Sequence, residues 1–92
     1  SNKPLEKSNN GINIYPNPAK ENITIAIELE NAGLVTVKVF NSLGQLQMEI
    51  GGIQGTSGKN EIEMNISELQ TGMYVLIAET ESRLFTQKLI VR

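Results

Sequence analysis

Glutamates are the main candidates for acid–base chemistry in this sequence. Its 92 residues include ten acidic residues, all of them Glu, and no Cys, His, Asp or Trp. Without Cys or His, a zinc site, a Ser–His or Cys nucleophile system and a haem ligand are excluded, and without Asp the usual calcium loop and aspartic dyad are excluded. The sequence therefore predicts no metal, no cofactor and no enzyme activity, and only Glu-based acid–base chemistry stays formally open.

The carboxylate pair best spaced for acid–base catalysis is Glu61 and Glu63. Two residues apart on a strand, their Cα atoms would lie about 7 Å apart on one face, and carboxylate pairs perform glycoside chemistry at about 5–9 Å. Both alternate with the apolar Ile62 and Met64, so they fall on the outer face, where Glu keeps a sheet soluble and blocks edge pairing. We interpret the pair as solvated charge.

A glycine-rich segment, residues 51–60, invites comparison with a phosphate-binding loop. A Walker motif ending at Gly58-Lys59 needs Gly at position 53 and Ser or Thr at position 60, where Ile53 and Asn60 stand. The segment lies between two expected strands, so there is no helix N-terminus to receive phosphate. We predict a flexible hairpin loop.

The charges and apolar runs exclude two classes of partner. The net charge is −2 and the basic residues are scattered, which argues against nucleic acid and against a polybasic membrane patch. No apolar run approaches the roughly 18 residues of an integral membrane helix. Carbohydrate binding by a β-sandwich normally uses a platform of aromatic rings, and only four rings are present: Tyr15, Phe40, Tyr74 and Phe85.

A period of two in the apolar residues predicts the elements that position these groups. It is clearest at residues 22–29, where Ile23, Ile25, Ile27 and Leu29 alternate with polar or small residues. In residues 45–50 the same pattern places Leu46, Met48 and Ile50 inside. The other expected strands are residues 12–15, 34–40, 61–66, 73–78 and 84–91.

Short strands at 8–12-residue spacing predict an all-β fold, an immunoglobulin-like antiparallel β-sandwich of about seven strands. The Cys–Trp–Cys set of true immunoglobulin domains is absent. We expect one domain at residues 12–92, preceded at residues 1–11 by a linker or cloning remnant.

Two expected strands are apolar on both faces. Residues 73–78 carry no polar side chain on either face except the Tyr74 hydroxyl, and on residues 84–91 Leu84 and Ile90 lie opposite Phe85 and Leu89. One interpretation is a central strand whose outer face is covered by a loop or by the N-terminal segment. The other is an apolar stripe that docks a partner, since large exposed apolar patches mark interaction sites.

The segment Tyr15-Pro16-Asn17-Pro18 forms a stiff, extended corner. Each proline keeps the residue before it out of the helical region and removes a backbone donor, so the first strand ends here. The Tyr15 ring could then lie over the edge of the sandwich as a lid.

Four motifs in order give this chain its family resemblance. They are Tyr15-Pro16-Asn17-Pro18, then Val35-x-Val37-x-Val39-Phe40-Asn41-x-x-Gly44-Gln45, then Leu69-x-x-Gly72-x-Tyr74, then Lys88-Leu89-Ile90-Val91 close to the last residue. Together they resemble the type A C-terminal sorting domain of the type IX (Por) secretion system of Bacteroidetes. The resemblance covers residues 12–92, and the position of the last strand suggests the tail of a longer precursor.

The resemblance implies a non-catalytic secretion signal that takes a cargo protein to the cell surface or medium. It implies transit through the periplasm, recognition by an outer-membrane translocon, removal by a sortase-like cysteine peptidase near the linker, and an N-terminal cargo domain. Lys88, Leu89, Ile90 and Val91 are the expected recognition residues. Two alternatives remain, a generic immunoglobulin-like spacer or adhesion module and a carbohydrate-binding module of a surface protein.

Overall fold

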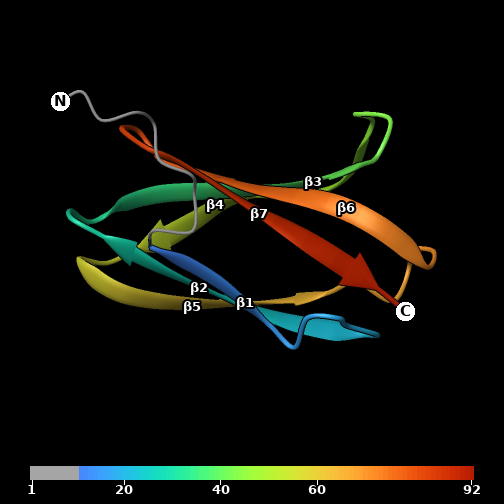
Figure 1. The fold of residues 1–92 in the computed structure, drawn as a ribbon. Coiled ribbons are helices and arrows are strands. Elements are labelled where there is room, and N and C mark those ends of the chain that lie inside the picture. Colours follow the sequence, from blue (N-terminus) through green and yellow to red (C-terminus); the bar gives the residue numbers. More distant parts are fainter. Residues whose placement is uncertain (1–10) are drawn as a thin grey trace, which may run out of the picture.

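The computed structural model describes residues 11–92, which form a two-layer sandwich (Figure 1). One sheet has the strand order β1-β2-β5 and the other β4-β3-β6-β7, and all pairs within them are antiparallel. The part described contains no helix, so the predicted all-β sandwich is confirmed. The strands are β1 (Ile12–Tyr15), β2 (Asn22–Leu29), β3 (Gly33–Asn41), β4 (Leu46–Gly55), β5 (Gly58–Asn65), β6 (Gly72–Glu79) and β7 (Leu84–Val91).

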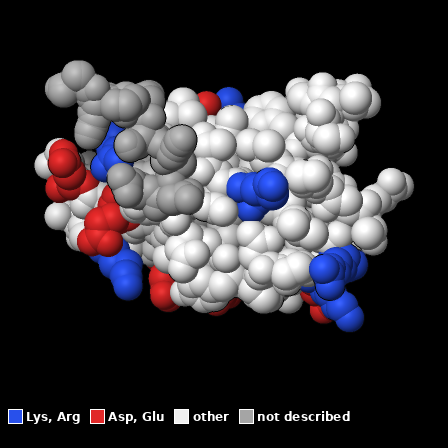
Figure 2. Space-filling model, viewed as in Figure 1, with Lys and Arg blue, Asp and Glu red and all other residues white. Residues whose placement is uncertain are grey.

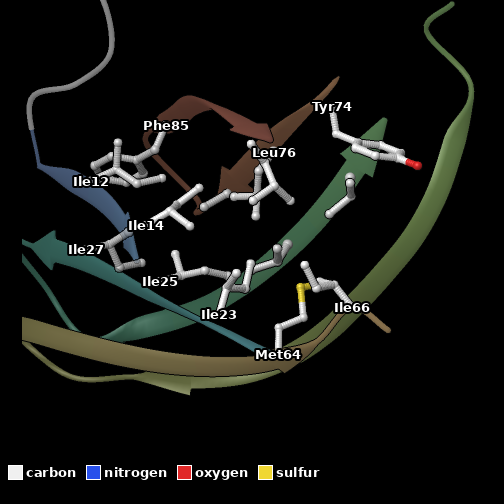
Figure 3. Close-up of a cluster of buried hydrophobic side chains, with 14 of the residues drawn as sticks. Ile12, Ile14, Ile23, Ile25, Ile27, Met64, Ile66, Tyr74, Leu76 and Phe85 are labelled. Carbon is white, nitrogen blue, oxygen red and sulfur yellow. The ribbon is translucent and has the colours of Figure 1, made fainter. Parts of the chain in front are cut away.

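The core lies between the two sheets and follows from the alternation of the strands. Successive side chains of a strand point to opposite faces, so each regular strand sends every second residue inward. Fully burying one such aliphatic side chain stabilises the fold by roughly 1.5–3 kcal/mol. Figure 3 shows side chains of both sheets meeting in this layer, among them Ile12, Ile14, Ile23, Ile25, Ile27, Met64, Ile66, Tyr74, Leu76 and Phe85.

The predicted flexible hairpin loop at residues 51–60 is wrong. β4 continues through Gly55, and two residues separate it from β5. β4 pairs with β3 whereas β5 pairs with β2, so the chain crosses from one sheet to the other instead of turning back. β4 accommodates its glycines through a register shift opposite Val35 and Val37 and a φ of +69° at Gly52, as β-bulges allow.

A second register shift changes which side chains of β4 face the core. The shift lies between Val39 and Phe40, where β4 has one extra residue. Met48 and Ile50 pack against the core as predicted. Leu46 instead pairs with Phe40 and is 48% exposed, so its predicted inward position is wrong. One inserted residue exchanges the two faces of a strand, which is why simple alternation fails here.

The strand with two apolar faces, β6, lies between β3 and β7 and is therefore central to its sheet. Tyr74, Leu76 and Ala78 are buried on its inner face, whereas Met73 and Val75 on the outer face are 51% and 37% exposed. No loop within residues 11–92 buries these two outer side chains. A cover by the segment before residue 11, one of the two interpretations of this strand, lies outside the described residues.

β7 has the two faces that its sequence predicted. Phe85, Leu89 and Val91 are buried in the core, Leu84 is exposed and Ile90 is half-buried. β7 and β1 lie on the same side of the sandwich in Figure 1. Figure 2 shows this side as largely uncharged, with charged groups gathered toward its two ends and one basic group near its middle.

Candidate recognition site

The first motif begins where β1 ends. Tyr15 is the last residue of β1, and both prolyl peptide bonds that follow, Tyr15–Pro16 and Asn17–Pro18, are cis. The Tyr15 ring lies on the outer face of the three-stranded sheet, because Ile12 and Ile14 of the same strand point inward. It does not close the edge of the sandwich as a lid, so that prediction is wrong.

Tyr15 is held in place by a partner on β5. Its hydroxyl donates a hydrogen bond of 2.9 Å to Oε2 of Glu61, reaching across β2, which lies between β1 and β5. The pKa of Tyr15 is raised, first because the hydrogen bond to the Glu61 carboxylate stabilises the protonated hydroxyl, then by desolvation, then because that negative charge repels a phenolate. The contact ties the start of the domain to the far strand of its sheet.

Asn17 connects the first motif to the last one. Its side-chain Nδ2 donates to the backbone oxygen of Lys88 at 2.9 Å, and its Oδ1 accepts from the backbone N–H of Ile90 at 3.0 Å. Ala19, two residues on, forms a parallel bridge with Val91 and is buried. The segment after β1 therefore runs along the outer edge of β7.

The third motif forms a corner at the start of β6. The Tyr74 ring is buried, and its hydroxyl donates a hydrogen bond of 2.6 Å to the backbone oxygen of Gln70, four residues earlier. This geometry is similar to the tyrosine corner of immunoglobulin-like domains, in which a strand-F tyrosine bonds the backbone just upstream. Gly72 begins β6 and pairs with Val91.

The second motif ends in the β3–β4 turn. Gly44 has a φ of +84°, a left-handed conformation that glycine adopts without steric cost. The Asn41 side chain closes the turn, because its Oδ1 accepts hydrogen bonds of 2.9 Å from the N–H groups of Leu43 and Gln45. Asn41 also pairs with Tyr74 of β6, which places this turn beside the tyrosine corner.

The last motif divides between core and surface. Leu89 and Val91 are 0% and 2% exposed and belong to the core. Lys88 is exposed and Ile90 is half-buried on the outer face of β7. Lys88 and Ile90 are therefore the side chains of this motif that a partner could contact on a folded domain.

The four motifs meet at one end of the four-stranded sheet. β3 ends there, β4 and β6 begin there, β7 ends there, and residues 16–19 pass along its edge. Figure 1 shows the C-terminus and the β3–β4 turn toward this end. A hollow of about 370 Å³ opens at it, lined by the β3–β4 turn and residues 68–74. We call this region the motif end.

The geometry offers binding surface and little catalytic chemistry. In residues 11–92 no group of three potential ligands could hold a metal ion, and the buried side chains in that range are all apolar apart from the bonded hydroxyl of Tyr74. Glu61 and Glu63 are exposed on the outer face, as predicted. Of the four aromatic residues Tyr15 is 41% exposed and Phe40 is half-buried, whereas Tyr74 and Phe85 are buried. Tyr15 and Phe40 lie on different sheets, so they form no common aromatic platform for a sugar.

Two long-range contacts of the first motif are not evident in the sequence. The bonds from Tyr15 to Glu61 and from Asn17 to β7 join residues 46 to 73 positions apart. An Asn between two prolines is the one local signal, since neither flanking proline has a backbone N–H to which its carboxamide could bond.

Comparison with known families agrees with the motifs. The family model of the secretion system C-terminal sorting domain matches residues 13–92, which include every motif residue described above. No curated protein matches the chain. Among the described residues no helix is long and apolar enough to cross a membrane. Because the family match spans nearly the whole chain, this protein belongs to the C-terminal sorting domains of the type IX secretion system.

Proposed function

We propose that the secretion machinery recognises this domain at its motif end, with Lys88 and Ile90 of β7 as contacts. As a sorting domain of the type IX system, the chain is a secretion signal that directs a cargo protein to the cell surface or medium. The observation that supports this proposal is the alternation at the end of β7, where the exposed Lys88 and the half-buried Ile90 face outward while Leu89 and Val91 lie in the core. Such a pattern displays a charge and an apolar side chain at a fixed spacing.

The route is part of the same proposal. The cargo would precede residues 12–92, with residues 1–11 as the linker, and would pass through the periplasm before the outer membrane. An outer-membrane translocon would bind the folded domain, and a sortase-like peptidase would then cut near the linker. The small size of the folded unit and its seven closely paired strands suit a signal that is read in the folded state.

Replacing the exposed lysine tests this recognition. We expect Lys88→Ala to lower the surface delivery of a reporter fused ahead of residue 1 several-fold in a host with the type IX system. Its melting curve should stay close to that of the unaltered domain, because substitutions of exposed side chains usually change stability by no more than about 0.5 kcal/mol. Lys59→Ala, at an exposed lysine on the other sheet, is the matched control and should be delivered normally.

A second variant tests whether the end of β7 must stay accessible. A short polar tail added after Arg92 should also reduce delivery, since it would obstruct a partner that approaches the motif end. If both Lys88→Ala and the tailed variant reach the surface at unaltered levels, β7 is only structural and the proposed recognition site is wrong.

We also expect the purified domain to show no hydrolytic activity of its own. The chain lacks His, Cys and Asp, and its carboxylates Glu61 and Glu63 face solvent. Panels of ester, peptide and glycoside substrates provide the measurement. Turnover that is lost on substitution of a single residue of the domain would contradict this expectation.

A further inference from the structure

The outer edge of β7 makes backbone hydrogen bonds beyond those that pair the strands of its sheet. β7 lies at the border of its sheet and pairs with β6 along one edge only. The other edge of such a strand presents backbone N–H and C=O groups that point away from the sheet. Four consecutive groups of this kind are Lys88 C=O, Ile90 N–H, Ile90 C=O and Arg92 N–H, and two residues, Asn17 and Ala19, bond all of them.

The four bonds follow the pattern of a parallel ladder. In that ladder one residue donates to, and accepts from, the two residues that flank its partner. Ala19 does so with its backbone, donating to Ile90 C=O and accepting from Arg92 N–H, both at 2.8 Å. The Asn17 carboxamide does the same one step earlier, with Lys88 C=O at 2.9 Å and Ile90 N–H at 3.0 Å.

Asn17 thus takes the place of a peptide unit. Its two partners fix which way the amide faces, because a carbonyl can only accept and an N–H can only donate. In a parallel ladder alternate residues bond the same edge, so Asn17 is the next residue upstream of Ala19 that would bond β7. Here its side-chain amide supplies both of these bonds. We call residues 17–19 the clasp.

One end of the clasp, Ala19, packs in the core. The other end, Asn17, is held to β7 through its side chain. Ala19 is 1% exposed and bridges Val91, which is 2% exposed, so this end is packed as well as bonded. Asn17 and Pro18 are exposed. At the Asn17 end the carboxamide supplies the hydrogen bonds that hold the backbone of Lys88 and Ile90.

We propose that Asn17 is a positioning residue of the secretion signal, whose carboxamide fixes the end of β7 so that Lys88 and Ile90 are presented in one ordered geometry. The end of an edge strand opens readily, because few contacts hold it. Lys88 and Ile90 face outward only while Leu89 and Val91 stay in the core. This inference rests on the recognition of β7 proposed above.

Amide hydrogen exchange on the whole 92-residue chain tests the clasp without reference to secretion. In Asn17→Ala, we expect the amides of Ile90 and Arg92 to exchange about tenfold faster, while Val37 and Leu76 in the interior strands stay unchanged. The Arg92 amide is the informative probe, because it bonds to the Ala19 backbone and not to Asn17. Asn13→Ala, an exposed asparagine on β1, is the control and should change none of the four.

Two results of the exchange experiment would overturn the inference. If only Ile90 accelerates, Asn17 makes a local hydrogen bond and there is no clasp. If Val37 and Leu76 accelerate equally, Asn17 supports the whole fold and does not position one strand end.

Delivery of the fused reporter then separates this inference from the proposed function. We expect Asn17→Ala to reduce surface delivery several-fold and Asn13→Ala to leave it unchanged. Normal delivery of Asn17→Ala, in a setting where Lys88→Ala is impaired, would overturn the positioning role alone. If Lys88→Ala is delivered normally, the recognition proposal fails, and the positioning role, which depends on it, fails too. The exchange data still decide whether the clasp exists.

Discussion

Val37→Asp is expected to unfold the domain. Val37 lies in the middle of β3, an interior strand, and is 0% exposed. It faces the core between Ile50 of β4 and Ala78 of β6, and none of these neighbours can pair with a carboxylate. An unpaired charge at such a site costs several kcal/mol, a large part of the total stability of a small domain. Circular dichroism should show no cooperative thermal transition at 25 °C and above.

Lys38→Gln is the matched control, because it changes the next residue of the same strand on the opposite face. Lys38 forms an ion pair of 3.5 Å with Glu79, and the two side chains are 29% and 38% exposed. A partly exposed pair of this kind contributes roughly 0–1 kcal/mol, so this variant should melt only slightly earlier. Equal losses in the two variants would show that the inward and outward faces of β3 are assigned wrongly.

The regular strands could be predicted because their alternation is a local property of the sequence. In β2 the predicted and observed bounds coincide, and the residues expected inside are buried, namely Ile23, Ile25, Ile27 and Leu29. Strand β4 could be predicted only in part: the strand expected at residues 45–50 and the inward Met48 and Ile50 are confirmed, but the continuation to Gly55 and the outward position of Leu46 were missed. Its two register shifts depend on pairing with β3, and glycine is typical of loops and of bulges alike, so nothing local distinguishes the two.

The same distinction between local signals and long-range contacts applies to the motif end. The turn at Gly44 could be predicted, because a left-handed glycine between two strands is a local signal. The sequence also marked Lys88 and Asn17, but it could not show that Asn17 bonds the backbone of Lys88, since 71 positions separate them. Contacts of that range form only when the two sheets are stacked, so they become visible only in the three-dimensional fold.

Gly55→Ala is expected to destabilise the domain by about 1–3 kcal/mol, the usual effect of overpacking a filled core. Gly55 is the buried last residue of β4, where the chain leaves one sheet for the other. A Cβ atom there would lie 2.6 Å from Cδ1 of Leu29, 3.2 Å from the backbone oxygen of Gly33 and 3.3 Å from Cγ2 of Val35. The Leu29 methyl can rotate away, but the Gly33 oxygen is fixed by the strand, so the backbone must move.

Its cross-strand partner Gly33 supplies the control, because the two glycines are directly paired and differ in the space around them. A Cβ atom on Gly33 meets nothing within 4 Å. Gly33→Ala should therefore leave stability unchanged or raise it by about 0.4–1 kcal/mol, since alanine restricts the unfolded chain. Urea unfolding of both variants measures the difference, and Gly55→Val should lose more than Gly55→Ala because it adds two methyl groups to the same space. If Gly55→Ala and Gly33→Ala were equally stable, the crossing between the sheets would be loosely packed, and residues 51–60 would behave as the flexible loop that their composition suggests.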